Sequence, residues 1–264
     1  MCIRDRTVTL ALCTGGVLAA LTAYPAVSDE QHNLQPPVVR TPSPATSDSP
    51  SQSTHLEAPR VSLGTDRVTQ GLIPGVGPDT MAQLPSDARQ VLVASSPRPA
   101  DTASTLTMYE YRDSEWQQVK TFASHNGRSG WRENRTEGDE TTPAGVFSLS
   151  DAGGTLKDPG SKLPYSQDVN LSATAQNVYG PDYAQVFDYV IAIDFNRVTG
   201  TPPTDTERPQ GRKIGGGIWL HVDHGKGTNG CVTVQKDGMA WLLRNLNPDK
   251  NPHIIMGDQA FISQ

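Results

Sequence analysis

Short runs of apolar residues separated by polar turns fill the last two thirds of the chain. From Gln90 onward these runs are rich in β-branched and aromatic residues, and glycine, proline or polar residues bound them. Runs of this length and composition predict β-strands. The predicted strands are 90–96, 106–112, 116–126, 144–150, 187–196, 215–223, 230–234 and 252–257.

One late segment has a helical pattern instead. Met239, Leu242, Leu243 and Leu246 recur at helical spacing, and the pattern stops at Pro248. Many short strands with one late helix predict a mainly β fold, either a β-sandwich or a small barrel, rather than a parallel α/β sheet.

The N-terminus has the pattern of an export signal. Residues 1–28 combine Arg4 and Arg6 with an apolar stretch over 8–23 and small residues at the end. This order predicts a cleaved signal peptide, and an uncleaved membrane anchor is the alternative. The opening "MCIRDR" is unusual and resembles a spurious start.

The segment 29–88 separates this leader from the predicted strands. Most of it is proline, serine and threonine with few bulky side chains, so it predicts a disordered linker. Its last part, 61–88, is a transition in which turns surround a short helix. We therefore expect the folded domain over 89–264.

The net charge and the cysteine content limit the classes of function that are possible. The formal net charge of −6 and the absence of a basic cluster argue against nucleic-acid binding. Cys2 and Cys13 lie in the predicted leader, so Cys231 would be the only thiol of the mature protein and no disulfide framework is possible. Exported free thiols oxidise unless they are kept for chemistry, which draws attention to Cys231.

The surroundings of Cys231 fit a nucleophile. His221 ends one predicted strand and Cys231 opens the next, and the loop between them is long enough to bring the two side chains face to face. His221 would then act as the base that forms the thiolate. Gly230 leaves room in front of the thiol, and the N–H groups of Gly230 and Cys231 could stabilise an oxyanion.

Two other interpretations compete with this one. A cysteine flanked by valine can be an inert core residue. A zinc site could use His221, Asp223, His224, Cys231 and His253, yet on a strand His221 and Asp223 point one way and His224 the other. We expect no metal and no cofactor.

The stretch "IWLHVDHGKGTNGCVTV" resembles the active-site signature of the L,D-transpeptidase catalytic domain of the YkuD type. That signature is a strand-borne His, then Ser or Thr, a variable residue, Gly and Cys, which match His221, Thr228, Asn229, Gly230 and Cys231. The block "RTEGDETTPAGVFSL" (135–149) is similar in order and spacing to a motif of actinobacteria-like members. The resemblance covers about residues 90–258.

The chain departs from the family pattern at three points. The interval between His221 and Cys231 is shorter than in most members, so the base could be His221 or His224. We favour His221, because it occupies the strand end. Asn229 stands where His is common, and Thr233 stands where Arg is frequent.

The resemblance implies a secreted enzyme of the cell envelope that acts on peptidoglycan. The Cys231 thiolate would attack a tetrapeptide donor stem, and D-alanine would leave with a proton from His221. The thioester would then pass to an amine, giving a 3→3 cross-link, or to water, giving carboxypeptidase activity. A catalytically silent peptidoglycan-binding module is the alternative.

The same resemblance implies the partners and the supporting residues. Thr228, Asn229, His224 and Asp223 are the candidates for orienting or binding the substrate. The partners would be peptidoglycan stem peptides and no nucleic acid, with a membrane contact only through an uncleaved leader. We expect a monomer.

Some loop residues between the two motif blocks could add to the site. Trp131, Tyr165, Tyr179 and Tyr183 could line a peptide groove or anchor local packing. Arg135 is expected to pair with nearby acids.

Overall fold

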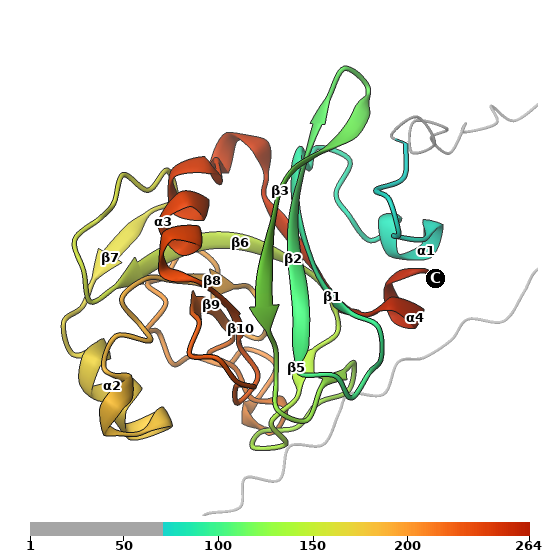
Figure 1. The fold of residues 1–264 in the computed structure, drawn as a ribbon. Coiled ribbons are helices and arrows are strands. Elements are labelled where there is room, and N and C mark those ends of the chain that lie inside the picture. The colour runs from blue at the N-terminus through green and yellow to red at the C-terminus, as the bar shows by residue number, and fades with distance from the viewer. Residues whose placement is uncertain (1–70) are drawn as a thin grey trace, which may run out of the picture. The chain divides into compact units, whose positions relative to one another are not determined.

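A sheet of nine strands forms the body of the domain in the computed structural model, which describes residues 71–264 (Figure 1). Its strand order is β10, β9, β8, β6, β11, β1, β2 and β3, with β7 paired to β6. The strands are β1 (Gln90–Ser96), β2 (Ala103–Arg112), β3 (Glu115–His125), β6 (Gly145–Gly154), β7 (Tyr165–Gln167), β8 (Val190–Ile193), β9 (Trp219–Val222), β10 (Val232–Val234) and β11 (His253–Asp258). A separate pair joins β4 (Trp131–Arg132) to β5 (Thr142–Pro143).

The two ends of this sheet, β3 and β10, lie against each other (Figure 1). The backbone N–H of His125 in β3 donates to Oγ1 of Thr233 in β10 at 3.0 Å. The sheet therefore curls into a nearly closed barrel, and the prediction of a mainly β fold is confirmed.

Strand β1 is covered on both faces, which explains its unbroken apolar run. Leu92 and Ala94 face the main core inside the curled sheet. Val91 and Val93 face a second cluster on the other side of the strand. Alternate side chains point to opposite faces of a strand, so burial on both sides requires apolar residues at every position.

The predicted late helix is α3 (Lys236–Asn245), and it covers the main core with Met239, Leu242 and Leu243. Gly238 lets the helix approach the sheet closely. A Cβ at that position would lie 2.4 Å from Cγ1 of Val234.

Helix α2 (Leu171–Tyr179) was not predicted: Leu171, Ala175 and Val178 have helical spacing, but the run is short and Val178 is exposed. Only Leu171 and Ala175 are buried, in a small cluster with Phe187. Short helical segments complete the fold: α1 (Pro78–Met81), α4 (Gln259–Ile262) and the 3₁₀ turns Pro181–Tyr183, Arg212–Ile214 and Pro248–Lys250. No helix within 71–264 is long and apolar enough to cross a membrane.

Residues 71–88 pack onto the domain. Ile73 and Val76 are buried in the second cluster, and the N–H of Gly77 donates to the carbonyl of Ile262 at 2.8 Å. The part of the transition that the structure describes thus belongs to the folded unit, and it contains the expected short helix, α1. The predicted leader 1–28, and the linker up to residue 70, lie outside the described residues.

Candidate active site

Strands β9 and β10 are parallel neighbours, and their register sets the position of the thiol. Thr233 lies opposite His221, and Val232 lies opposite Leu220. Cys231, which directly precedes β10, is therefore level with Trp219 rather than with His221. Trp219 and His221 lie on the same face of β9, because they are two residues apart.

The Cys231 thiol is almost completely buried, with 7% of the residue exposed. Its Sγ accepts a hydrogen bond from the N–H of Trp219 at 3.4 Å and lies 3.7 Å from the carbonyl of Gly217. Burial raises the pKa of the thiol to about 11, against the opposing effects of the Trp219 N–H and the charge of Arg135. At neutral pH the thiol is therefore protonated, and it needs a base to react.

His221 is fully buried, and both of its ring nitrogens have partners. Nδ1 lies 2.9 Å from the carbonyl of Val222, and Nε2 lies 3.2 Å from the hydroxyl of Tyr179. A carbonyl can only accept, so Nδ1 carries the proton and Nε2 has the free lone pair. Burial lowers the pKa of His221 to about 4, so the ring is neutral at neutral pH and can take up a proton.

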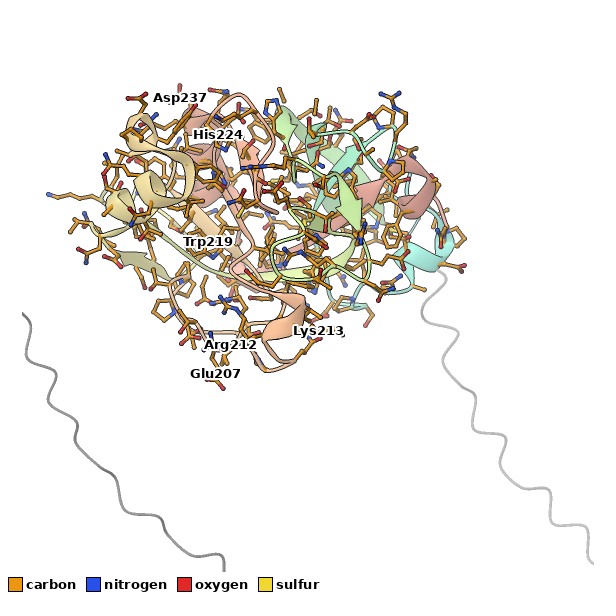
Figure 2. All side chains as sticks on the ribbon, turned by 90° about the horizontal axis from the view of Figure 1, so that it is seen from below. Glu207, Arg212, Lys213, Trp219, His224 and Asp237 are labelled. Atoms are coloured by element: carbon orange, nitrogen blue, oxygen red, sulfur yellow. The ribbon has the colours of Figure 1, made fainter. Side chains whose placement is uncertain are left out.

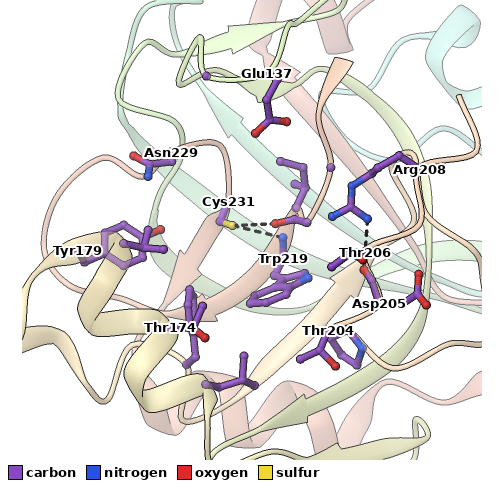
Figure 3. A pocket seen from close by; sticks show the side chains of 18 of the residues that line it. Glu137, Thr174, Tyr179, Thr204, Asp205, Thr206, Arg208, Trp219, Asn229 and Cys231 are labelled. Atoms are coloured by element: carbon purple, nitrogen blue, oxygen red, sulfur yellow. Dashed lines mark hydrogen bonds between the residues drawn. The ribbon is translucent and has the colours of Figure 1, made fainter. Parts of the chain in front are cut away.

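Tyr179 contacts His221 and lies on the cavity that contains Cys231 (Figure 3). It is the last residue of α2. Burial raises its pKa well above the usual range, the Cys231 charge adds to this effect, and the N–H of Asn229 opposes it. From the sequence we expected Tyr179 only to line a peptide groove or to anchor local packing. Its contact with His221 could not be predicted from a local pattern, because the two residues lie 42 positions apart.

Gly230 and Thr228 form a tight turn in front of the thiol. Gly230 has φ 136°, and a Cβ there would lie 2.9 Å from the carbonyl of Thr141. Its N–H donates to Oγ1 of Thr228 at 3.0 Å, and that hydroxyl donates to the carbonyl of Cys231 at 2.7 Å. In this structure the Gly230 N–H is therefore not free to bind an oxyanion, contrary to our expectation.

The other sequence candidates have different surroundings. The carboxylate of Asp223 bonds to His125 at 2.8 Å and to Thr233, so it joins β9 and β10 to β3. Burial alone would raise the pKa of Asp223, but these hydrogen bonds outweigh it and lower the pKa. Asn229 lines the cavity, and its Oδ1 accepts from Arg128 at 2.6 Å.

His224 packs against aromatic rings rather than against the thiol. Its ring lies 4.6 Å from that of Tyr179, 5.7 Å from that of Tyr183 and 5.9 Å from that of His221. Both ring nitrogens are buried without a hydrogen-bond partner among the described residues. Figure 2 shows His224 beside the helical segment that covers this side of the site.

The remaining aromatic candidates are packing anchors or neighbours of the site. Nε1 of Trp131 donates to Oγ of Ser96 at 2.7 Å, and the hydroxyl of Tyr165 donates to the carbonyl of Leu156 at 3.0 Å. Neither residue lines the cavity that contains Cys231.

The cavity itself has a volume of about 610 Å³ and opens onto Cys231, Trp219 and Tyr179 (Figure 3). Four acidic residues and two arginines also line it: Glu137, Glu140, Asp168, Asp205, Arg135 and Arg208. It is large enough for a peptide segment.

The residues considered for zinc do not gather in one place. Within 71–264 no group of three or more His, Cys, Asp or Glu side chains is arranged to hold a metal ion. Nδ1 of His253 in β11 bonds to the carbonyl of Asn251, and Asp223 bonds to β3 and β10.

A curled, mainly β domain with a cavity-facing thiol and a neutral histidine on the adjoining strand defines a class of domain suited to acyl transfer. Comparison with known families identifies it further: residues 100–255 match the YkuD L,D-transpeptidase catalytic domain. Because the match covers more than half of the chain, the chain belongs to this family. The resemblance inferred from the sequence is thereby confirmed.

Two solved structures are similar to this chain at low identity. One is Bd1075 of Bdellovibrio bacteriovorus, 20% identical, covering 64% of this chain and 47% of that one with a TM-score of 0.34. The other is a fused Zn-dependent amidase/peptidase/peptidoglycan-binding domain-containing protein of Clostridium acetobutylicum, 14% identical, covering 64% and 51% with a TM-score of 0.31. The chain spans about half the length of these proteins, and TM-scores this low support no inference. No curated protein matches the chain.

Proposed function

We propose that this protein is a peptidoglycan L,D-transpeptidase in which Cys231 is the nucleophile and His221 is the base. The observation that carries the proposal is a neutral imidazole with its lone pair on Nε2, on the strand next to a cavity-facing thiol. Family membership supplies the reaction class. His224 is the weaker candidate for the base, because neither of its ring nitrogens has a hydrogen-bond partner among the described residues, whereas the Val222 carbonyl fixes the tautomer of His221.

The two pKa values constrain the order of events. A thiol with a pKa of about 11 does not give its proton to an imidazole with a pKa of about 4 before the substrate arrives. We therefore expect proton transfer to accompany attack on the carbonyl, when the sulfur charge moves onto the substrate. The Tyr179 hydroxyl occupies Nε2, so it has to pass the proton on or move aside.

The proposed reaction has two acyl transfers. Sγ of Cys231 forms a bond to the carbonyl carbon of the donor stem while the thiol proton goes to His221. The C–N bond to the terminal D-alanine breaks, and the leaving amine takes that proton. An acceptor amine then attacks the thioester, its proton passes through His221 to the departing sulfur, and the thiol is restored. Water in place of the amine gives hydrolysis.

Intact mass spectrometry after incubation with a carbapenem tests the proposal, because a carbapenem acylates a thiol of this kind as the donor would. We expect one adduct, mapped to the peptide that contains Cys231 and not to those with Cys2 or Cys13. Cys231→Ala should lose it, and Thr233→Ser serves as a conservative control on the same strand. An adduct that persists in Cys231→Ala would refute the proposal.

The cellular setting belongs to the same proposal. The substrate lies outside the cytoplasm, so the protein would act at the cell envelope, in keeping with the export signal predicted for residues 1–28. Retention on isolated sacculi without release of D-alanine would point to a silent binding module instead.

A further inference from the structure

Three consecutive glycines, Gly215, Gly216 and Gly217, come shortly before β9, and two arginine side chains lie against them. A Cβ on Gly215 would lie 2.5 Å from Nη1 of Arg135, and one on Gly216 would lie 2.1 Å from Nε of Arg208. A Cβ on Gly217 would lie 3.4 Å from Nη2 of Arg208. The glycines therefore leave the space that the two guanidinium groups fill.

Arg135 is a buried cation whose hydrogen bonds go to backbone carbonyls. Only 4% of the residue is exposed, and it donates to the carbonyls of Thr141 and Ile214 at 3.0 Å each. Its nearest carboxylate, Asp139, lies 3.7 Å from Nε and already accepts hydrogen bonds from Thr136 and Thr141. The expected pairing of Arg135 with acids is thus reduced to one long contact.

The outer nitrogen of Arg135 points toward the nucleophile. Nη2 makes no hydrogen bond to a described residue, and it lies 3.6 Å from the place where a Cβ of Gly230 would be. Glu137 also reaches Gly215, on the Nη1 side of the guanidinium. The Nη2 side, toward Gly230, is left for a ligand. Because the one ion pair of Arg135, with Asp139, is long and is made through Nε, an anionic ligand is favoured on the Nη2 side.

Arg208 is the second cation of the pair. Its Nη1 donates to the carbonyls of Asp205 and Glu207 at 3.2 and 2.8 Å, and it forms no ion pair with a described carboxylate. Figure 3 shows Arg208 reaching into the cavity on the side of Trp219. Both arginines line the cavity that contains Cys231.

The spacing from the thiol suits a short leaving group. Gly217, on which Arg208 lies, also places its carbonyl 3.7 Å from Sγ of Cys231. One residue of extended chain spans about 3.5 Å, so the carboxylate of a single amino acid beyond the scissile carbonyl would extend past Gly217 toward the Arg208 guanidinium. Guanidinium groups bind carboxylates through paired, charge-assisted hydrogen bonds.

We propose that Arg135 and Arg208 bind the terminal carboxylate of the donor stem, so that the enzyme acts where one residue with a free carboxylate follows the scissile bond. This inference rests on the proposed function.

Three synthetic donor stems test the subsite: the tetrapeptide with a free carboxylate, its C-terminal amide, and a pentapeptide. For the wild-type protein we expect kcat/KM to be about 10- to 100-fold lower for the amide and the pentapeptide, the range for a lost charge-assisted hydrogen bond. Arg208→Gln should lower kcat/KM for the free carboxylate by a similar factor and bring the ratio of the free carboxylate to the amide close to one. Arg135→Lys should lower kcat/KM for the free carboxylate to a smaller extent. This substitution keeps the positive charge in the buried site.

A control variant outside the cavity and a measurement of thiol reactivity complete the test. Arg212→Gln, in an exposed loop position outside the cavity (Figure 2), should retain the full preference for the free carboxylate. Alkylation of Cys231 by neutral iodoacetamide should proceed at the same rate in Arg208→Gln as in the wild type. A preference that survives in Arg208→Gln would overturn the subsite.

Measuring the affinity for the donor stems distinguishes an error in the proposed subsite from an error in the proposed function. Calorimetry with Cys231→Ala compares the same three stems without turnover, and we expect the free carboxylate to bind about 10- to 100-fold more tightly than the amide. Equal affinities would refute the carboxylate subsite. A clear preference in binding without turnover by the wild-type protein would refute the transpeptidase proposal and leave the subsite standing.

Discussion

The hydroxyl of Tyr179 lies 3.2 Å from Nε2 of His221, and it occupies the only nitrogen of that ring with a free lone pair. The base of the proposed reaction is therefore covered by a side chain from α2, which lines the same cavity as Cys231. Any account of proton transfer in this site has to include Tyr179.

Replacing Tyr179 with Phe tests this relationship. If the hydroxyl passes the thiol proton to His221, Tyr179→Phe should slow carbapenem acylation by about 100-fold, the lower range for a lost acid–base group. Tyr183→Phe, a neighbouring ring on the same segment, should acylate at the wild-type rate. Faster acylation in Tyr179→Phe would show that the hydroxyl blocks the base rather than serving it.

The buried His221 predicts a pH dependence of stability. Its pKa falls from 6.5 to about 4 on folding, so the folded state favours the neutral ring. The resulting stability is fully present above pH 6.5 and is lost as the pH falls toward about 4, by about 3 kcal/mol in all. In urea unfolding, His221→Gln should show a flatter dependence between pH 6.5 and 4 than the wild type. If the unfolding free energy of His221→Gln falls as steeply with pH as that of the wild type, groups other than His221 cause the pH dependence.

The conformation of Gly230 predicts a cost for any side chain. Gly230→Ala would place a Cβ 2.9 Å from the Thr141 carbonyl at a φ of 136°, so we expect a loss of about 2–3 kcal/mol of unfolding free energy and slower alkylation of the thiol. Gly225→Ala is the control: it also has a positive φ, 78°, but no atom lies within 4 Å of its Cβ position. It should lose about 1 kcal/mol and leave alkylation unchanged. If both variants lose the same unfolding free energy, the contact with the Thr141 carbonyl does not contribute to the cost at Gly230.

Thr228 holds the turn through its hydroxyl rather than its shape. Thr228→Val keeps the volume but leaves the N–H of Gly230 without its acceptor, so we expect a loss of about 1–3 kcal/mol in thermal or urea unfolding together with slower acylation of Cys231. Thr228→Ser keeps the hydroxyl and should restore most of both. If the valine variant acylates normally, the turn does not depend on this bond.

Much of the fold could be predicted from the sequence, because a strand or helix that buries a whole face has an apolar pattern within its own residues. The continuous apolar run of β1 and the helical spacing of Met239, Leu242 and Leu243 both reflect burial that the sequence has to satisfy. Helix α2 escaped prediction for the opposite reason. With only Leu171 and Ala175 buried, it depends on contacts with distant residues rather than on a face of its own.

The sequence alone predicted the family, which the comparison confirms, and it proposed the pair of His221 and Cys231, because the order and spacing of these residues are local features. Only the tertiary structure decided which groups surround the pair. It brought Tyr179 to His221, gave the N–H of Gly230 to Thr228, and set Arg135 and Arg208 against three glycines. Such contacts join residues far apart in the chain, so they follow from how the sheet curls and how loops cross it, which no local pattern contains.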